Sequence, residues 1–341
     1  MGVTIKQIAS IAGVSRGTVD RVLNNRGRVN PDIDIRVKEI ANRMNYRPNR
    51  AAKALAANKK PIHIGLVVPA EGNQFFHDVI RGTQKQQKDL ADFGVSVEVH
   101  TVKGFDVEKQ LAMMDGFLKK CIHGLILTPI DDPRIGRKID EMSEQGIPVV
   151  TTNSDINHSK RLAYVGSDYY KGGITAGALM KYLTNGSDKI AIVTGSLKML
   201  GHRQRVEGFL DKIKSEKNGI QVVATKECND DIFIAYDETK EILQQHPDLK
   251  AIYIGAGGTE GVCKAVKQMK REDEVRIVCF DLTPPIRSYM EEGMIDFAIL
   301  QEPEYQGRKP VELLFEYLIN DVKPTKEFYY TKTEICIKES M

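Results

Sequence analysis

Residues 4–23 read TIKQIASIAGVSRGTVDRVL, a stretch that predicts two short helices separated by a tight turn. Thr4 and Gln7 have the spacing of a capping box, in which two side chains satisfy backbone N–H groups at the start of a helix. Gly13 permits the turn, and Ser15 can cap a second helix that runs to the end of the stretch. Two helices joined by a short glycine-containing turn predict a helix-turn-helix.

A third helix follows, and the three helices share a predicted core. Asn30-Pro31 marks its start, because proline is favoured at the first helical position. Apolar residues recur at helical spacing in the first and third helices. The residues expected to be buried are Ile5, Ile8, Ala9, Ala12 and Val14 near the amino terminus, and Val37, Ile40, Ala41 and Met44 in the third helix.

The charge of the chain is concentrated around these helices. Residues 1–60 contain 13 lysines and arginines against four acids, a net charge of +9. The whole chain carries only +3, so residues 61–341 carry −6. A strongly positive small helical domain favours binding to a polyanion, and neutralisation of phosphates is the main source of sequence-independent DNA affinity.

This amino-terminal region resembles the headpiece of the lac-repressor (LacI) family of bacterial transcription regulators. The resemblance lies in VTIKQIA at 3–9, AGVS at 12–15, TVDRVLN at 18–24, NYRPN at 45–49 and Leu55-Ala56. It implies a headpiece over 1–48, a hinge helix and linker over 49–60, and a homodimer bound to double-stranded palindromic operator DNA.

The resemblance also implies which residues contact DNA. Arg16 and Gly17 occupy the base-reading positions at the start of the second helix, which enters the major groove. Leu55 is the wedge that enters the minor groove from the hinge. Phosphate contacts are implied for Thr4, Ser15, Thr18, Arg21, Asn24 and Tyr46, and the hinge residues Asn49 and Ala56 complete the DNA-binding set.

Asp20 departs from the family pattern, which usually has a small hydroxyl residue at this position. A carboxylate near DNA either accepts a hydrogen bond from a cytosine amino group or turns toward a neighbouring arginine. Arg16, Arg21 and Arg26 are the candidate partners, and the sequence leaves the choice open.

Residues 61–341 contain short apolar runs that alternate with longer helical stretches such as Phe75–Phe93 and Glu108–Cys121. Such runs suit strands buried on both faces, so the pattern predicts parallel sheets built from βαβ units. No run reaches the ~18 apolar residues of a membrane helix, and no signal peptide is evident, so we expect a cytoplasmic protein without membrane contact. The predicted strands are Ile62–Val68, Gly124–Leu127, Val149–Val150, Lys189–Val193, Gln221–Ala224, Ala251–Ile254, Arg276–Phe280 and Phe297–Leu300.

Five cysteines, at 121, 228, 263, 279 and 336, are widely spaced and form no CxxC motif. Their odd number and spacing favour buried free thiols in a reducing compartment. The histidines show no metal-ligand spacing. We therefore expect neither a metal site nor a cofactor.

This body resembles the ribose-type periplasmic sugar-binding proteins. The expected fold class is therefore α/β: a small all-α helix-turn-helix headpiece joined to a two-lobed periplasmic-binding-protein-like body with parallel sheets. The resemblance implies an N-lobe of about 61–164 and 302–330 and a C-lobe of about 165–300 and 331–341. The ligand would lie in the cleft, in agreement with the rule that ligands bind beyond the carboxyl ends of parallel strands.

The residues at these strand ends suit a sugar or another polyol. Aromatic rings can cover the apolar face of a sugar, while carboxylates, amides and a guanidinium can bond its hydroxyl groups. The predicted ligand-binding residues are Asn73, Phe75, Phe76, Asp131, Asn153, Arg205, Asp281 and Gln301.

Two departures from the ribose-type pattern indicate a different ligand. Ser154 replaces an arginine, and the loop 255–258 replaces an asparagine-aspartate pair with GAGG. Both changes remove polar groups and enlarge the cleft, so a bulkier or differently decorated ligand than ribose is expected.

Structural roles compete with these assignments. Phe76 can simply pack a helix, Asp281 and Asp131 can be turn or cap residues, and Arg205 can pair with Glu207 on the surface. The loop 255–261 does not fit a dinucleotide fingerprint, because Glu260 occupies a required glycine position.

The leading interpretation is a transcription regulator controlled by a sugar-like effector, and not an enzyme. The alternative is a sugar-modifying enzyme, a kinase or dehydrogenase, fused to a DNA-binding head. The chain has no phosphate-binding P-loop, no dinucleotide fingerprint and no G-x-S-x-G elbow. A third possibility is an architectural DNA-binding protein that ignores small molecules.

Overall fold

The computed structural model describes residues 3–23, 29–44, 46, 61–69, 71–215 and 219–341. Contacts divide the chain into two compact units, Met1–Lys60 and Pro61–Met341. Each unit has its own hydrophobic core, and that of the larger unit is divided among four clusters.

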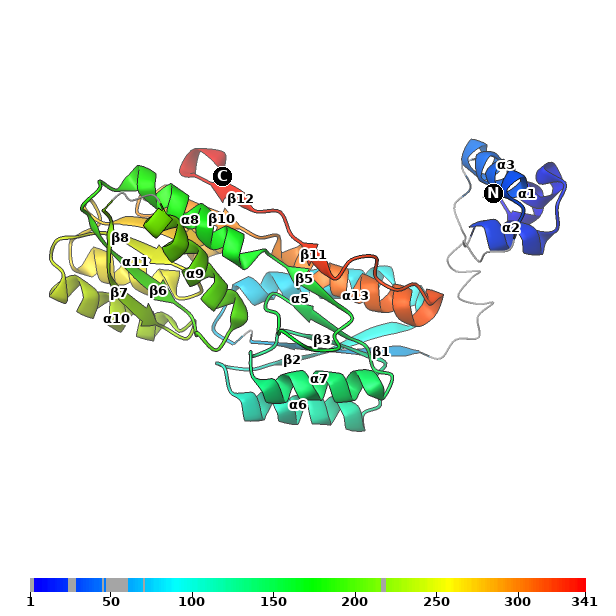
Figure 1. Cartoon of the computed structure of the whole chain (residues 1–341), viewed down its shortest axis with the longest axis horizontal. Helices are drawn as coiled ribbons and strands as arrows, with labels where there is room; N and C mark the ends of the chain where they lie inside the picture. Colours follow the sequence, from blue (N-terminus) through cyan, green and yellow to red (C-terminus); the bar gives the residue numbers. More distant parts are fainter. Residues whose placement is uncertain (1–2, 24–28, 45, 47–60, 70, 216–218) are drawn as a thin grey trace. The chain divides into compact units, whose positions relative to one another are not determined.

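The amino-terminal unit contains the predicted helix-turn-helix and the third helix (Figure 1), with helices α1 (Ile5–Ala12), α2 (Arg16–Leu23) and α3 (Pro31–Arg43). The Thr4–Gln7 capping box is present: the Gln7 N–H donates to Thr4 Oγ1 at 3.4 Å and the Thr4 N–H donates to Gln7 Oε1 at 2.8 Å. Gly13 has a φ of +65°, a backbone conformation that glycine adopts without strain.

The core of this unit is smaller than the sequence predicts. Ile8, Ala9, Ala12, Val19, Val22, Val37 and Ala41 are buried. Ile5, Val14, Ile40 and Met44, which were also expected inside, are only partly buried and pack around this cluster. A three-helix unit of this size has too little interior to bury every apolar side chain completely.

The larger unit contains two six-stranded sheets. All strand pairs in the first sheet are parallel. Its strands lie in the order β11 (Phe328–Tyr330), β5 (Ala163–Gly166), β4 (Val149–Thr152), β3 (Gly124–Leu127), β1 (Ile62–Val68) and β2 (Val95–Thr101).

The second sheet is parallel except at one edge, where β12 runs antiparallel to β10. Its strands lie in the order β12 (Glu334–Cys336), β10 (Phe297–Leu300), β9 (Arg276–Phe280), β8 (Leu249–Ile254), β6 (Lys189–Thr194) and β7 (Gln221–Glu227).

Helices cover both faces of each sheet and form two lobes (Figure 1). In the N-lobe, α5 (Phe75–Asp89) and α13 (Pro303–Asn320) cover one face, and α6 (Val107–Lys119) and α7 (Pro133–Glu144) the other. In the C-lobe, α8 (Tyr169–Leu183) and α9 (Leu200–Ser215) cover one face. The opposite face carries α10 (Ile232–Gln245), α11 (Thr259–Gln268) and α12 (Pro284–Glu291).

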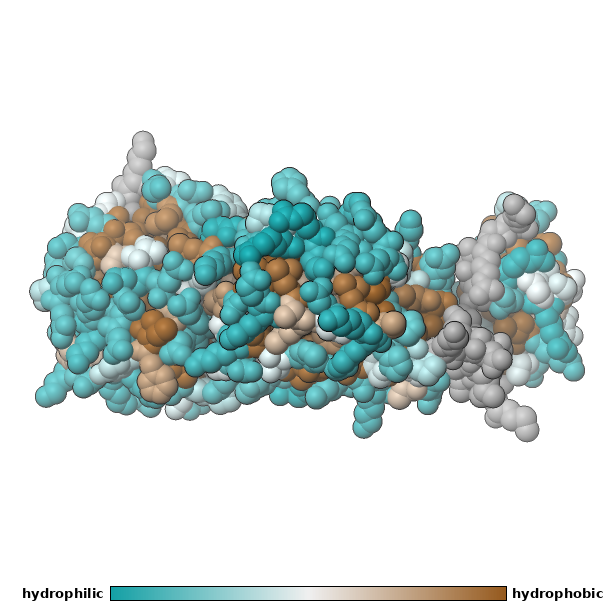
Figure 2. Space-filling model, turned by 90° about the horizontal axis from the view of Figure 1, so that it is seen from below, coloured by the Kyte–Doolittle hydropathy of each residue, from teal (hydrophilic) through white to brown (hydrophobic). Residues whose placement is uncertain are grey.

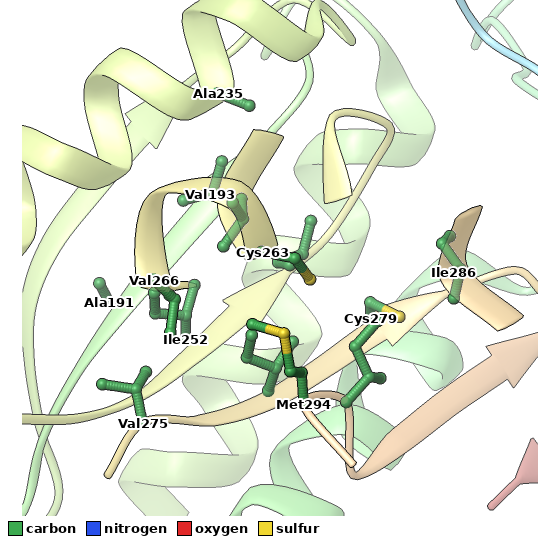
Figure 3. Packing of buried hydrophobic residues seen from close by; sticks show 14 of the residues in the cluster. Ala191, Val193, Ala235, Ile252, Cys263, Val266, Val275, Cys279, Ile286 and Met294 are labelled. Atoms are coloured by element: carbon green, nitrogen blue, oxygen red, sulfur yellow. The ribbon is translucent and has the colours of Figure 1, made fainter. Parts of the chain in front are cut away.

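Figure 3 shows the core beneath this last face, where Val193 and Ile252 of the sheet pack near Cys263 of α11. Short 3₁₀ turns occur at Ala91–Phe93 and Lys338–Ser340. The chain passes between the two sheets three times, after β5, β10 and β11. These three crossovers place the carboxyl ends of strands from both lobes around one pocket.

All five cysteines are free thiols, as predicted, and four of them are buried. Cys121 is exposed, so the prediction of burial was wrong for this residue. It lies in the turn after α6 with a φ of 53°, where the chain leaves the helix before reaching β3.

The surface is largely hydrophilic in the view of Figure 2, with hydrophobic residues in small separate groups. Within the described ranges, no helix combines the length and apolar character needed to cross a bilayer.

Candidate functional site

A pocket with about 430 Å³ of empty space, part of it open to solvent, lies between the two lobes. Seven of the eight predicted ligand-binding residues line it: Asn73, Phe75, Phe76, Asn153, Arg205, Asp281 and Gln301. Asp131 is not among the lining residues. Further lining residues that the sequence did not single out are Pro69, Phe105, Tyr169, Met199, Gly201, His202 and Asp230.

Two phenylalanines at the start of α5 form the aromatic wall of the pocket. The rings of Phe75 and Phe76 meet edge to face, with centroids 5.4 Å apart. Both side chains belong to the N-lobe core and also line the pocket. The structural and the functional interpretations of Phe76 are therefore compatible, because packing fixes the ring that faces the cleft.

Arg205 on α9 is buried, with 4% of its surface exposed. Its Nη1 donates to the Gly255 carbonyl and its Nη2 donates to Gln301 Oε1, both at 2.9 Å. The guanidinium carbon lies 3.6 Å from the ring centroid of Phe280 and 4.5 Å from that of Tyr169. These contacts replace the hydration of the buried charge, so Arg205 is a fixed part of the pocket and not a surface partner of Glu207.

Asp281 follows β9 and is held by Gln301. Gln301 Nε2 lies 2.8 Å from one carboxylate oxygen and 3.1 Å from the other. The N-cap of α12 is Thr283, so Asp281 does not cap that helix. Burial raises the pKa of Asp281 to about 6, although Arg205 and the Gln301 hydrogen bonds oppose this effect, while Asp230 and Asp78 add to it.

Asp281→Asn is expected to make the protein more stable at neutral pH. The folded-state pKa of about 6 lies above the ordinary aspartate pKa of 3.8, so the folded protein holds the proton more tightly than the unfolded chain does. The stabilisation by this proton is complete below about pH 4 and is lost as the pH rises through about 6. The amide of the Asp281→Asn variant does not titrate, so this pH-dependent loss of stability does not occur in it. Its free energy of unfolding should therefore exceed that of the wild type by roughly 1–3 kcal/mol at pH 7. Urea denaturation of both proteins across this range tests the prediction, and parallel stability curves would contradict it.

Asp230, in the turn between β7 and α10, joins the two lobes. Its Oδ2 accepts from Asn73 Nδ2 of the N-lobe at 3.2 Å, and its Oδ1 accepts from the Gly257 N–H at 2.9 Å. Asn73 Oδ1 accepts from the Phe75 N–H at 3.1 Å, which fixes the amide orientation. A ligand in the pocket is thus enclosed by a direct polar contact between the lobes.

Asp131 makes a second contact between the lobes, away from the pocket. Its carboxylate forms an ion pair with Arg203 of α9, and its N–H donates to the Lys198 carbonyl at 2.9 Å. The cap of α7 is the neighbouring Asp132, which accepts from the Arg134 N–H at 2.9 Å. Asp131 is therefore neither a helix cap nor a lining residue in this closed arrangement.

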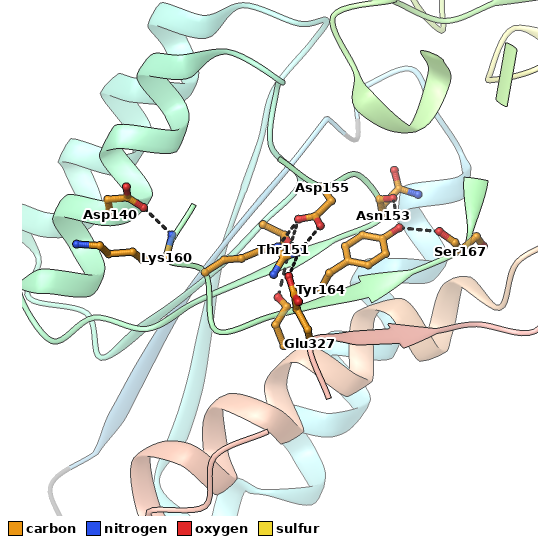
Figure 4. Close-up of polar contacts among 10 residues, drawn as sticks. Asp140, Thr151, Asn153, Asp155, Lys160, Tyr164, Ser167 and Glu327 are labelled. Atoms are coloured by element: carbon orange, nitrogen blue, oxygen red, sulfur yellow. Dashed lines mark hydrogen bonds and ion pairs between the residues drawn. The ribbon is translucent and has the colours of Figure 1, made fainter. Parts of the chain in front are cut away.

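Asn153 lies at the end of β4 in a polar network (Figure 4). Its Nδ2 donates to Gln306 Oε1 at 3.3 Å. The Tyr164 hydroxyl lies 3.0 Å from the Asn153 carbonyl and 2.9 Å from the Ser167 carbonyl. Asn153, with a φ of 63°, and Asp281, with a φ of 69°, both have left-handed backbones, which asparagine and aspartate tolerate better than most residues.

One residue from each crossover takes part in a buried hydroxyl-amide cluster. Ser167 Oγ lies 2.7 Å from Thr331 Oγ1 and donates to Gln301 Oε1 at 3.3 Å. Gln301 also contacts Arg205 and Asp281, so it connects the pocket directly to the crossovers. The sequence predicted Gln301 alone among the members of this cluster.

His202 is a lining residue whose protonation the fold determines. Burial lowers its pKa, and the nearby Asp230 carboxylate only partly opposes this effect. Its Nδ1 lies 3.0 Å from the Ser196 nitrogen and 3.1 Å from the Ser196 carbonyl oxygen, and its ring meets Phe105 edge-on at 5.9 Å. Burial therefore favours a neutral imidazole at this position in the lining.

The headpiece residues at the start of α2 are arranged as the helix-turn-helix requires. Ser15 Oγ accepts from the Thr18 N–H at 3.1 Å and lies 2.9 Å from the Thr18 hydroxyl. Arg16 and Gly17 are exposed, and Arg21 Nε donates to the Gly17 carbonyl at 3.2 Å. Thr4 is exposed and Tyr46 half-buried, whereas Asn24, Asn49, Leu55 and Ala56 lie outside the described residues.

Burial, followed by the charge of Asp20, raises the pKa of Tyr46. Asp20 therefore acts electrostatically on a predicted phosphate-binding residue. This effect does not decide between the cytosine and arginine partners.

Comparison with known proteins assigns both units to families. Residues 64–321 match the periplasmic binding protein domain, and residues 4–49 match the bacterial regulatory proteins of the lacI family. The chain belongs to these families: it is a lacI-family transcription regulator whose effector domain has the periplasmic-binding-protein fold.

Its relatives include both regulators and sugar-binding proteins. The ribose operon repressor of Halalkalibacterium halodurans is 27% identical, and the alignment covers 99% of this chain and 96% of the repressor. The ribose import binding protein RbsB of Bacillus subtilis is 24% identical over 78% of this chain and 84% of RbsB.

A solved structure is also similar to the larger unit. The glucose-galactose binding protein GanP of Geobacillus stearothermophilus is 31% identical, with a TM-score of 0.76 over 83% of this chain and 99% of that one. The predicted class of regulator and the two-lobed fold are confirmed, and these relatives give no support to the enzyme alternative.

Proposed function

We propose that the protein binds a palindromic operator in double-stranded DNA as a homodimer and is controlled by a neutral sugar in the cleft. The observation that carries the effector part is the unit formed by Arg205, Gln301 and Asp281 opposite the Phe75–Phe76 wall. It presents fixed polar groups on one side and aromatic carbon on the other.

This arrangement suits a ring with several hydroxyl groups. A hydroxyl both donates and accepts, so it can bond to the carboxylates of Asp281 and Asp230 and to the amide of Asn153. The C–H face of a sugar ring can lie against Phe75 and Phe76. The relatives named for ribose and for glucose-galactose support a sugar as the ligand class.

The DNA-binding part rests on the exposed start of α2 and the charge of the headpiece. Arg16 and Gly17 would face base edges, while Thr4, Ser15, Thr18, Arg21 and Tyr46 would hold phosphates, with the hinge residues adding minor-groove contacts. A protein with this role acts where the chromosome is, so we also propose a cytoplasmic location.

A two-stage experiment tests this function. A thermal-shift screen of sugars should identify compounds that raise Tm, since a ligand that binds only the folded state stabilises it. Fluorescence anisotropy with DNA selected from random sequence should then give a DNA affinity whose logarithm falls linearly with the logarithm of the salt concentration. The DNA affinity should also change when the sugar is added. Sedimentation equilibrium should give a dimer. No stabilisation by any sugar, or salt-independent DNA binding, would contradict the proposal.

A further inference from the structure

A second space adjoins the first pocket. It contains about 460 Å³ of empty space, part of it open to solvent, and lies between the start of α5 in the N-lobe and the starts of α11 and α12 in the C-lobe. Asn73, Phe75, Ala256, Gly257 and Asp281 line both spaces. The two spaces therefore meet at these residues, and a ligand with one unit in each would cross this boundary.

The walls of this second space combine apolar surface with polar side chains. Ile232, Pro285 and Ile286 provide the apolar part. Gln74 and Thr283 are the N-cap residues of α5 and α12, yet neither side chain makes a capping hydrogen bond in the part of the chain that the structure describes. These two groups, one from each lobe, are thus available to a ligand.

The loop 255–258 borders this space without large side chains. A Cβ atom added to Gly257 would lie 3.1 Å from Asp230 Cβ and 3.2 Å from Asn73 Nδ2, so the contact between the lobes leaves no room for a side chain. Gly258 has a φ of +88°, and a Cβ there would lie 2.9 Å from Ala235 Cβ. The close packing of both positions explains why a loop without large side chains borders the cleft.

The charges around the second space disfavour an anion there. Asp281 and Glu260 line it, and neither lysine nor arginine lines it among the described residues. Lys264 pairs with Glu260 at 2.6 Å and does not line this space. Arg205 belongs to the first pocket, where it donates to two neutral groups, the Gly255 carbonyl and Gln301 Oε1. A phosphate or carboxylate group in the second space would therefore meet the Asp281 carboxylate without a free cation.

We propose that the effector is a neutral two-unit carbohydrate, a disaccharide or glycoside, with one ring in the first pocket and the second unit in the second space. This proposal rests on the proposed function, because the first ring occupies the sugar site. The second unit would contact Gln74 and Thr283 with its polar edge and Ile232, Pro285 and Ile286 with its apolar face.

Calorimetry on the full chain with matched probes tests this proposal. The probes are glucose and galactose, their methyl and phenyl glycosides, the disaccharides maltose, cellobiose, lactose and melibiose, and the two hexose 6-phosphates. At least one two-unit probe should bind about tenfold more tightly than its parent monosaccharide, which corresponds to about 1.4 kcal/mol. Neither sugar phosphate should bind more tightly than its parent.

Variants separate the two spaces. Thr283→Tyr places a ring in the second space without removing a capping hydrogen bond, so it should cancel the tenfold gain and leave monosaccharide affinity unchanged. Ser288→Tyr, an exposed position of the same helix outside the lining, is the matched control and should keep the gain. Gln74→Trp, with the exposed His77→Trp as its control, repeats the test from the N-lobe in case Thr283→Tyr does not fold.

The outcomes distinguish this proposal from the function on which it rests. A monosaccharide that binds as tightly as every two-unit probe, or a gain that survives both Thr283→Tyr and Gln74→Trp, would overturn the two-unit effector alone. Tighter binding of a sugar phosphate would overturn the argument from charge. Failure of every sugar to bind would overturn the proposed function and this proposal together.

Discussion

Arg205→Ala is expected to abolish effector binding and to lower the free energy of unfolding by about 3–5 kcal/mol. The substitution leaves the Gly255 carbonyl and Gln301 Oε1 without their donor. It also removes the buried cation that favours the charged form of Asp281, and it opens a cavity between Phe280 and Tyr169. Both the pocket and the core of the C-lobe therefore depend on this one side chain.

Arg203→Ala is the matched control, because Arg203 lies on the same helix but is partly exposed and contacts only the edge of the cleft. It should cost at most about 1 kcal/mol of stability and only modestly reduce effector affinity. Urea denaturation and calorimetry provide the two measurements. Equal losses of stability and of effector affinity in the Arg205→Ala and Arg203→Ala variants would show that Arg205 is no more important to the pocket than Arg203.

Gly17→Glu is expected to reduce DNA affinity at least about 100-fold, because like charges brought together at an interface cost several kcal/mol. Gly17 is exposed, and an added Cβ would meet only Ser15 Oγ, at the ordinary distance of 3.7 Å. The variant should therefore fold normally, and an acid in the first turn of a helix is favoured by the helix dipole. The loss would come from a carboxylate facing phosphates and base edges.

Gly17→Ala serves as the control for this change, since it adds the Cβ without the charge. It should keep most of the affinity for a mixed-sequence duplex in anisotropy titrations. Circular dichroism should show unchanged helix content in both variants. Nearly equal DNA affinity of Gly17→Glu and the wild type would mean that α2 does not face the DNA.

Most of the strands whose bounds were predicted correctly are buried on both faces. Uninterrupted apolar runs identified β1, β3, β9 and β10 with their observed bounds. The same criterion missed β2, an edge strand in which polar residues alternate with valines. It also missed β11 and β12, three-residue edge strands that are largely exposed. The pairing of these two strands depends on where the crossovers bring the chain, which local composition does not encode. β5, a buried four-residue strand between β4 and β11, was missed as well.

The pocket was predictable where its residues follow strands. Asn153, Asp281 and Gln301 are such residues. Asp230 was not recognised, because it lies in the turn between β7 and α10, three residues after the strand ends. Tyr169 and His202 lie in the first turns of helices, where no strand-end rule applies. Asp131 was placed near the correct strand end, but its pairing with Arg203 depends on how the other lobe closes.

The cluster of Ser167, Gln301 and Thr331 would make the molecule act as a lever if a bound molecule rotated the two lobes. Its fulcrum is at the crossovers, near the carboxyl ends of the strands, whereas β1 begins at Ile62 at the opposite end of its seven-residue length. At ~3.3 Å per residue this arm is about 23 Å long, so a rotation of about 10° would move its far end by about 4 Å. Pro61 lies at that end, directly after the segment that leads from the headpiece. A rotation of this size would thus displace Pro61 by a distance close to the ~3.4 Å axial rise from one base pair of DNA to the next.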